Sequence, residues 1–199
     1  MCAKSAVGSG AATARSREPL GPNDLATLAV LGIVNEGFRS YADVVAAARS
    51  IATADWQPTN DLVASAVNRA LEDGHLRRDR RAAKAAVPRW TISGTGRVRL
   101  GELLRRPAAC CRSPHGRAAT ALKICFLGAL DRETGCAVLE DLSHLHRAEL
   151  RRLREGCASC PATRPYARRW MDREIERVEQ EIGWLERLQA DLPADTQGT

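Results

Sequence analysis

The chain has 199 residues, enough for one substantial domain or two small ones that share a core. Aromatic residues make up only 4% while Ala and Leu are frequent, which favours packed helices over a β-sandwich. There is no run of about 18 apolar residues and no apolar stretch before a cleavage site, which argues against a membrane-spanning or secreted protein. We therefore expect a mainly α-helical, cytoplasmic protein whose seven cysteines are reduced thiols.

Positive charge is concentrated in one segment. The formal net charge is +6, and residues 75–99 alone contain eight Lys or Arg and one Asp. The rest of the chain is therefore close to neutral, which is typical of a protein with a localised surface for binding polyanions. A solvated charged loop is the alternative interpretation.

The N-terminal segment predicts a tail and a first helix. Residues 1–22 are rich in Ala, Ser and Gly without apolar periodicity, which predicts a disordered tail. Asn23 or Asp24 can cap a helix that ends near Gly37. Its apolar positions, at helical spacing, are Leu25, Leu28, Ala29, Leu31 and Gly32.

Two further helices follow. Ser40 can cap a second helix, which ends before Pro58. Thr59 or Asn60 can cap a third helix, which Gly74 closes. The apolar face of the third helix consists of Val63, Ala66, Val67, Ala70 and Leu71.

Two short segments after the third helix predict a basic β-hairpin. Leu76-Arg-Arg-Asp-Arg-Arg and Val87-Pro-Arg-Trp-Thr-Ile can pair across an Ala-rich loop, and a short helix is expected from Thr95 to Arg106. Three helices followed by a basic hairpin are the order of a winged helix-turn-helix, in which the third helix enters the major groove. We assign residues 23–106 to this domain.

The C-terminal half predicts a second helical domain. Residues 107–117 contain Pro and Gly without periodicity and are interpreted as a linker, residues 118–192 as a helical dimerisation domain, and residues 193–199 as a tail. The last helix carries a nearly heptad seam that needs the preceding helix or a second subunit to cover it, and we expect both. The seam residues are Met171, Ile175, Val178, Ile182, Leu185 and Leu188.

Three stretches of the chain carry a family resemblance. They are Leu25-Ala-Thr-Leu-Ala-Val-Leu-Gly-Ile-Val, Thr91-Ile-Ser-Gly-Thr-Gly-Arg and Leu122-Lys-Ile-Cys-Phe-Leu-Gly-Ala-Leu-Asp. In this order they resemble the opening helix, the turn after the wing and the start of the C-terminal domain of the PadR family of transcriptional regulators, in particular members with a long helical C-terminal half of the virulence-activator type. Gly183-Trp-Leu-Glu-Arg-Leu is similar to the closing segment of the terminal helix. The resemblance implies a homodimer formed through that helix, and repression as the mode of action.

The chain departs from the family in two places. The usual Leu-Tyr-Pro-x-Leu of the recognition helix is Val63-Ala-Ser-Ala-Val67 here, and the usual His-Gly-Tyr before the second helix is Phe38-Arg-Ser-Tyr41. The sequence specificity of the DNA contact is therefore the feature that transfers least.

The polar side chains of the third helix and of the hairpin are the candidates for contact with double-stranded operator DNA. Asn and Arg can bond adenine and guanine bidentately, whereas numerous flexible arginines suit phosphates. Asp61 lies on the same polar helix face. The candidates are Thr59, Asn60, Ser65, Asn68, Arg69, Arg77, Arg78, Arg80, Arg81, Lys84 and Arg89.

The cysteines, histidines and tryptophans give weaker signals. Cys157-Ala-Ser-Cys160 has the spacing of a zinc half-site or a redox pair, but no second such pair follows, so no metal or cofactor is expected. His144 and His146 point about 200° apart on a helix and do not suit one metal ion. The four tryptophans either pack in a core or line a cleft for a small hydrophobic effector.

These features together predict a DNA-binding transcriptional regulator and not an enzyme, because no phosphate-binding loop, carboxylate pair or catalytic triad stands out. Two alternatives stay open. One is a helical module for protein–protein association without specific DNA binding. The other is a regulator that responds to thiol oxidation or a metal through Cys157 and Cys160.

Overall fold

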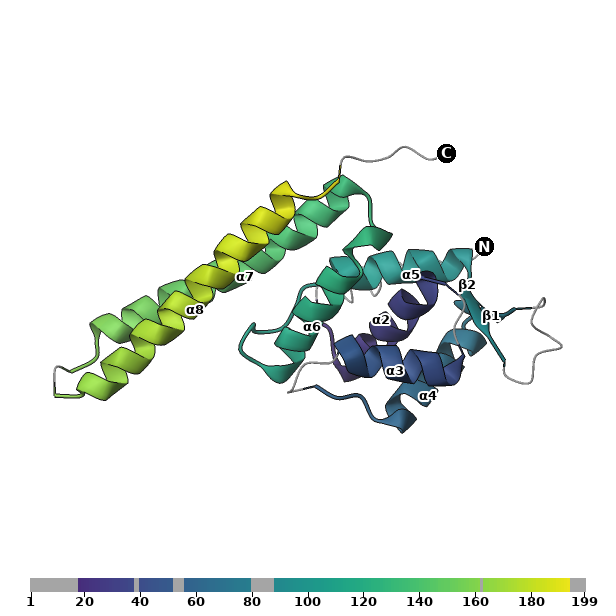
Figure 1. Ribbon diagram of the computed structural model, residues 1–199, viewed down its shortest axis with the longest axis horizontal. Helices are drawn as coiled ribbons and strands as arrows, with labels where there is room; N and C mark the ends of the chain where they lie inside the picture. The colour runs from purple at the N-terminus through teal and green to yellow at the C-terminus, as the bar shows by residue number, and fades with distance from the viewer. Residues whose placement is uncertain (1–17, 38–39, 52–55, 80–87, 162, 194–199) are drawn as a thin grey trace, which may run out of the picture. The chain divides into compact units, whose positions relative to one another are not determined.

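The computed structural model describes residues 18–37, 40–51, 56–79, 88–161 and 163–193. Within these ranges the chain is mainly helical with one small antiparallel sheet, as predicted (Figure 1). It divides into two compact units, one ending at Ala129 and the other beginning at Leu130. None of the helices in the described ranges has both the length and the apolar character that crossing a bilayer requires.

The first unit contains the winged helix-turn-helix. It has three helices, a two-stranded hairpin and two further helices, in the predicted order. Its elements are α2 (Pro22–Asn35), α3 (Tyr41–Ile51), α4 (Asn60–Glu72), β1 (Leu76–Arg78), β2 (Trp90–Ile92), α5 (Gly94–Arg105), α6 (Pro114–Cys125) and the short 3-10 helix η1 (Leu127–Ala129).

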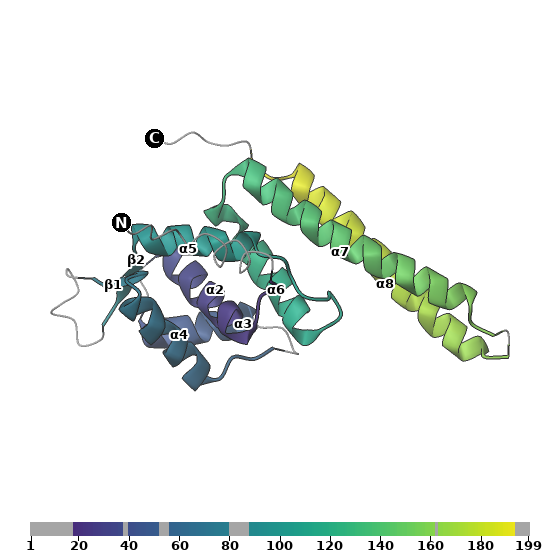
Figure 2. The same cartoon turned by 180° about the vertical axis from the view of Figure 1, so that it is seen from behind.

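Helix α2 is the centre of this unit. Its residues from Leu25 to Val34 are buried with the exception of Thr27, and it packs against α3, α4, α5 and α6 (Figures 1 and 2). A helix that is apolar nearly all round is stable only where neighbours cover every side. This explains why the most apolar stretch of the sequence lies in the middle of the fold.

The start of α2 differs from the prediction. The residue before the helix is Gly21, not Asn23 or Asp24, and Pro22 takes the first helical position, where its fixed φ angle is favourable. Asp24 instead reaches back and accepts a hydrogen bond from the Gly21 amide at 3.1 Å. The carboxylate therefore caps the helix from its third position.

The caps of α3 and α4 are as predicted. Ser40 and Asp43 form a reciprocal pair, in which the Asp43 amide donates to Ser40 Oγ at 3.3 Å and the Ser40 amide to Asp43 Oδ2 at 3.0 Å. Thr59 Oγ1 accepts from the Leu62 amide at 3.2 Å. Gly74, which follows α4, has a φ angle of 71°, a left-handed conformation that favours glycine.

The two basic segments pair as an antiparallel hairpin, as predicted. Leu76 lies opposite Ile92 and Arg78 opposite Trp90. One further backbone hydrogen bond, from the Asp79 amide to the carbonyl of residue 89 at 2.9 Å, extends the pairing. The connection between the strands, residues 80–87, lies outside the described residues.

The predicted linker 107–117 differs from the structure at its C-terminal end. Helix α6 already begins at Pro114, with Ser113 Oγ accepting from the Gly116 amide at 2.9 Å. Its first buried residues are small, so the sequence shows no bulky apolar period there. Because α6 packs against α2, the first unit extends to Ala129 and the predicted boundary at 117/118 falls inside a helix.

The second unit is an antiparallel pair of long helices, α7 (Arg132–Ala158) and α8 (Pro165–Ala190) (Figures 1 and 2). Asp131 caps α7 by accepting from the Thr134 amide at 2.8 Å. Ion pairs between the helices join Arg147 to Glu186 at 2.7 Å and Arg154 to Glu179 at 2.6 Å. Its apolar core contains Leu150, Leu153, Val178 and Ile182, with Ile175 packed against it.

Candidate nucleic-acid interface

Helix α4 has one buried and one exposed face. Val63, Ala66, Val67 and Ala70 are at most 3% exposed. The opposite face is polar and faces solvent, which is the arrangement a recognition helix needs. Its exposed side chains include Asp61, Ser65, Asn68 and Arg69.

The first residues of α4 already have partners. The side chain of Thr59 caps the helix. The amide oxygen of Asn60 accepts a hydrogen bond from Arg49 Nη2 at 3.0 Å, and the Asn60 carbonyl accepts one from the Tyr41 hydroxyl at 2.8 Å. Of the predicted base-reading side chains, Ser65, Asn68 and Arg69 are therefore the ones available without rearrangement.

The β1–β2 hairpin follows α4 in the sequence, belongs to the same unit and carries exposed arginines. Arg77, Arg78 and Arg89 are exposed, whereas Trp90, opposite Arg78, is 7% exposed. The buried strand residues anchor the hairpin to the unit while its guanidinium groups face solvent. The other predicted wing residues, Arg80, Arg81 and Lys84, lie outside the described residues.

A compact junction joins the hairpin to α4 and α5. The Gly74 carbonyl accepts from Ser93 Oγ at 2.7 Å and from Thr95 Oγ1 at 3.1 Å. Ser93 also caps α5 by accepting from the Gly96 amide at 3.0 Å. A Cβ atom at Gly96 would clash with the His75 carbonyl, so glycine is required for this close approach. The motif that resembles the turn after the wing thus positions the wing.

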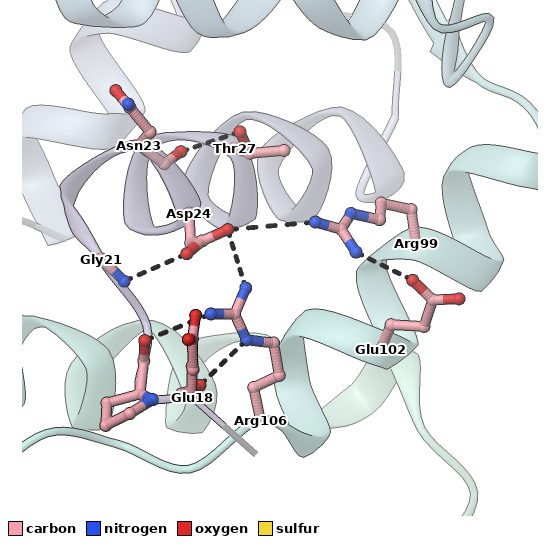
Figure 3. Close-up of polar contacts among 9 residues, drawn as sticks. Glu18, Gly21, Asn23, Asp24, Thr27, Arg99, Glu102 and Arg106 are labelled. Carbon is pink, nitrogen blue, oxygen red and sulfur yellow. Dashed lines mark hydrogen bonds and ion pairs between the residues drawn. The ribbon is translucent and has the colours of Figure 1, made fainter. Parts of the chain in front are cut away.

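Sequence reasoning missed an ionic clamp between the ends of α2 and α5. Asp24 pairs with Arg106 at 2.8 Å and with Arg99 at 3.9 Å, and Arg99 also pairs with Glu102 at 2.9 Å (Figure 3). Arg106 further donates to the Glu18 carbonyl at 3.2 Å. The acid at the third helical position was visible in the sequence, but its distant partners were not.

A small hollow lies between α2, the end of α4 and α5. Its volume is about 90 Å³, and Arg69 and Arg99 are among its lining residues together with Asp24, Asp73 and His75. His75 Nδ1 is buried there without a hydrogen-bond partner in the described part of the chain. Arg69 therefore lies where it can face either this hollow or solvent.

The predicted dimer seam is largely used within the chain. Val178, Ile182 and Leu185 are at most 8% exposed, because α8 packs on α7. Met171, Ile175 and Leu188 are half-buried. The large apolar side chains that α8 leaves in solvent are Tyr166 at 82%, Trp170 at 58% and Trp184 at 41% exposure.

The cysteines and histidines do not assemble a metal site in the described ranges, where no group of three or more His, Cys, Asp or Glu side chains suits an ion. Cys157 Sγ donates to Asp172 Oδ1 at 3.5 Å. Burial lowers the pKa of His146 and raises the pKa of Cys125. Two tryptophans, Trp56 and Trp90, are buried in the first unit.

A known family matches this arrangement over most of the chain. The family model described as "Putative AphA-like transcriptional regulator" matches residues 16–189. The chain belongs to this family. The predicted class, a transcriptional regulator, is thereby confirmed. Among curated proteins, none matches the chain significantly.

Solved structures that are similar to the chain include those of PadR from Bacillus subtilis. Its complex with p-coumaric acid is 17% identical, with 86% of this chain and 97% of that chain covered and a TM-score of 0.38. Its complex with operator DNA is 18% identical, with 82% and 97% covered and a TM-score of 0.37. At this distance the two likenesses assign no residue of the AphA-like chain.

Proposed function

We propose that this AphA-like regulator binds double-stranded operator DNA through its first unit, with α4 as the recognition helix and the β1–β2 hairpin on the phosphate backbone. The observation that carries the proposal is the pairing of an exposed polar face on α4 with exposed arginines on a hairpin fixed to the same unit. This division of labour is typical of winged helices.

The hairpin supplies affinity. Arg77, Arg78 and Arg89 are long, exposed cations, and no side-chain acid is paired with them in the described contacts. Each phosphate contact releases condensed counterions, so it steepens the slope of the logarithm of the binding constant against the logarithm of the salt concentration by about 0.9. Arg80, Arg81 and Lys84 of the connecting segment are proposed to add to the same contact.

The helix supplies sequence discrimination. Asn68 and Arg69 are exposed on adjacent positions of α4, one turn beyond Ser65. A bidentate contact from Asn or Arg to the correct base contributes about 1–3 kcal/mol of discrimination. Thr59 and Asn60, at the helix start, are proposed to contact the DNA phosphates and not the bases, since their polar side chains already have partners within the unit.

The second unit is proposed to form a homodimer through α8. A two-helix layer leaves one side of each helix uncovered, and here that side carries Trp170 and Trp184, fourteen positions apart on one helix. Fourteen residues are two heptads, so both rings lie on the same face. We therefore place the aromatic pair at the centre of the interface, with Met171, Ile175 and Leu188 at its edge.

Repression, the virulence-activator branch and a small hydrophobic effector are finer proposals that rest on the resemblance to PadR regulators. A dimer that covers an operator represses by excluding other proteins from it. A hollow of about 370 Å³ on α8, lined by Glu176, Glu179 and Arg187 among others, is polar and does not suit such an effector.

The primary test is fluorescence anisotropy with a fragment of the chain's own upstream region and a scrambled fragment, across a salt series. Replacing Arg77, Arg78 and Arg89 together by Ala should weaken binding to both fragments and flatten the salt slope by up to about 3. Asn68→Ala should lose only the preference for the upstream fragment.

Arg105→Ala is the matched control. Arg105 is an exposed arginine in the last turn of the twelve-residue helix α5, about 16 Å from its wing end. It should leave the affinity and the salt slope unchanged. Equal, weak binding of wild type and the triple variant at low salt would reject the DNA-binding proposal and favour a protein-association module, for which the exposed aromatic residues of α8 are the supporting observation.

A further inference from the structure

The end of α7 brings two thiols together. Cys157 lies in the last turn of the helix, and Cys160 follows the capping residue Ser159. The Cys160 amide donates to the Cys157 carbonyl at 3.1 Å, so the backbone between the cysteines forms a helical turn. In such a turn Cα atoms three residues apart are separated by about 5 Å, inside the range that a disulfide accepts.

The two thiols differ in their surroundings. Cys157, on α7, is 8% exposed and donates from Sγ to Asp172 Oδ1, on α8, at 3.5 Å. Burial and the Asp172 carboxylate raise the pKa of the Cys157 thiol, which disfavours its thiolate. Cys160 is partly exposed, and the contact of its thiol within the described residues is a long one with the Pro161 carbonyl at 3.9 Å. An oxidant from solvent therefore meets Cys160 first.

We propose that Cys157 and Cys160 are an oxidation-sensitive dithiol that closes to an intrachain disulfide under a hydroperoxide, with Asp172 as the proton acceptor for Cys157. The proposal is independent of DNA binding. It assigns different roles to the three side chains, and each role follows from exposure or from a contact.

The reaction has two steps. The Cys160 thiolate attacks the hydroperoxide, the O–O bond breaks, and Cys160 becomes a sulfenic acid while the alkoxide takes up the proton that Cys160 lost on ionisation. Cys157 Sγ then attacks Cys160 Sγ, so that the S–S bond forms and the S–O bond breaks. The Cys157 proton passes to Asp172 and on to the departing hydroxide, which leaves as water. Both thiols are oxidised by two electrons in total, and the hydroperoxide is reduced to alcohol and water.

Closing the disulfide has a structural consequence at the start of α8. The Cys157 S–H donor disappears, and Asp172 loses a hydrogen bond that joins α7 to α8. The apolar core between α7 and α8 lies further from this end of the helix pair and begins at Leu153 and Ile175. Oxidation should therefore loosen residues 164–173 and leave the core in place.

The test treats the reduced full-length chain with hydrogen peroxide and maps tryptic peptides by mass. Cleavage after Arg154 and Arg168 gives peptide 155–168, because Pro165 prevents cleavage after Arg164, and this peptide contains both thiols and no other cysteine. We expect this peptide to become lighter by two hydrogen atoms, reversibly with dithiothreitol, and hydrogen exchange in residues 164–173 to accelerate. A peptide that instead carries a sulfinic acid on Cys160 beside a free Cys157 would overturn the proposal.

Two variants separate the roles. Cys157→Ser keeps a donor for Asp172 but cannot form the bond, so Cys160 should accumulate as a sulfenic acid that a 1,3-dione traps. Asp172→Asn should slow closure roughly tenfold near neutral pH and make its rate rise more steeply with pH, because closure then depends on the small fraction of Cys157 that is already a thiolate. Asp141→Asn, an exposed acid on α7, is the control and should close at the wild-type rate. Equal rates for Asp172→Asn and wild type, with matching circular dichroism, would reject Asp172 as the proton acceptor.

Discussion

The two units of the chain bury their apolar residues in different ways. In the first unit, α2 is enclosed by four other helices, and residues such as Leu25, Leu28 and Leu31 have no exposed surface. In the second unit only two helices meet, and α8 leaves Trp170 and Trp184 in solvent. The first unit has a closed apolar core, as an independent domain does, whereas the second has exposed apolar side chains that a partner can cover.

The largest effect should come from a cavity in the first unit. Leu28→Ala removes a fully buried side chain from α2, and we expect a loss of about 2–5 kcal/mol in the free energy of unfolding, measured with urea. The same substitution at Leu188, half-buried on α8, should cost less than half as much in a dilute sample. Equal losses would mean that the two units do not differ in packing as described.

A smaller effect is expected at the junction of hairpin and helix. Gly96→Ala places a methyl group against the His75 carbonyl, so unfolding should become easier by about 1–3 kcal/mol and DNA affinity should fall with it. Gly94→Ala is the control, because no non-neighbouring atom of the described residues lies within 4 Å of a Cβ atom there. That variant should stay within about 0.5 kcal/mol of wild type.

The proposed dimer surface gives the next prediction. Trp170→Ala and Trp184→Ala should each raise the dissociation constant of the dimer about tenfold or more, measured by sedimentation velocity, because buried tryptophans often dominate interfaces. Val98→Ala changes an exposed apolar side chain of the first unit and should have no effect. Wild-type dimerisation in both tryptophan variants would place the interface elsewhere.

The smallest effect concerns pH. His146 is buried in the second unit with both ring nitrogens unpartnered in the described part of the chain. Burial lowers its pKa below 6.5, while Glu181, Arg177 and Glu149 act in opposing directions. A lowered folded-state pKa contributes stability that is present above pH 6.5 and is lost as the pH falls toward the folded value.

His146→Asn should therefore reduce the change in unfolding free energy between pH 7 and pH 5. His144→Asn, at an exposed position of the same helix, is the matched control and should retain the wild-type pH dependence. Identical pH profiles for all three proteins would show that His146 does not contribute to acid sensitivity.

Local patterns were sufficient to predict most of the fold. The caps at Ser40 and Thr59 and the apolar period of α4 are set by residues three or four positions apart, and each has the predicted structure. The hairpin was also predictable, since two short segments with some alternation on either side of an Ala-rich stretch can pair as antiparallel strands. The start of helix α6 was assigned to the linker because its buried face begins with Gly116 and Ala118 instead of large residues.

Long-range contacts could not be predicted. Nothing near Asp24 in the sequence indicates that Arg106 is its partner, and nothing near Asn60 indicates Arg49. The heptad seam on α8 correctly marked an apolar face for the preceding helix to cover, but the sequence did not show that Trp170 and Trp184 would lie outside that contact. Such choices depend on how helices far apart in the chain meet.

The junction at Gly74 has a consequence for how the proposed DNA-binding surface selects an operator. Ser93 and Thr95, which follow the second strand, both donate to the Gly74 carbonyl at the end of α4, so the proposed recognition helix and the base of the hairpin are joined directly. The distance between α4 and the base of the hairpin is then set before DNA binds, so less conformational entropy is lost on binding. A duplex whose groove width does not fit that fixed spacing has to deform itself, and DNA flexibility then becomes part of operator choice.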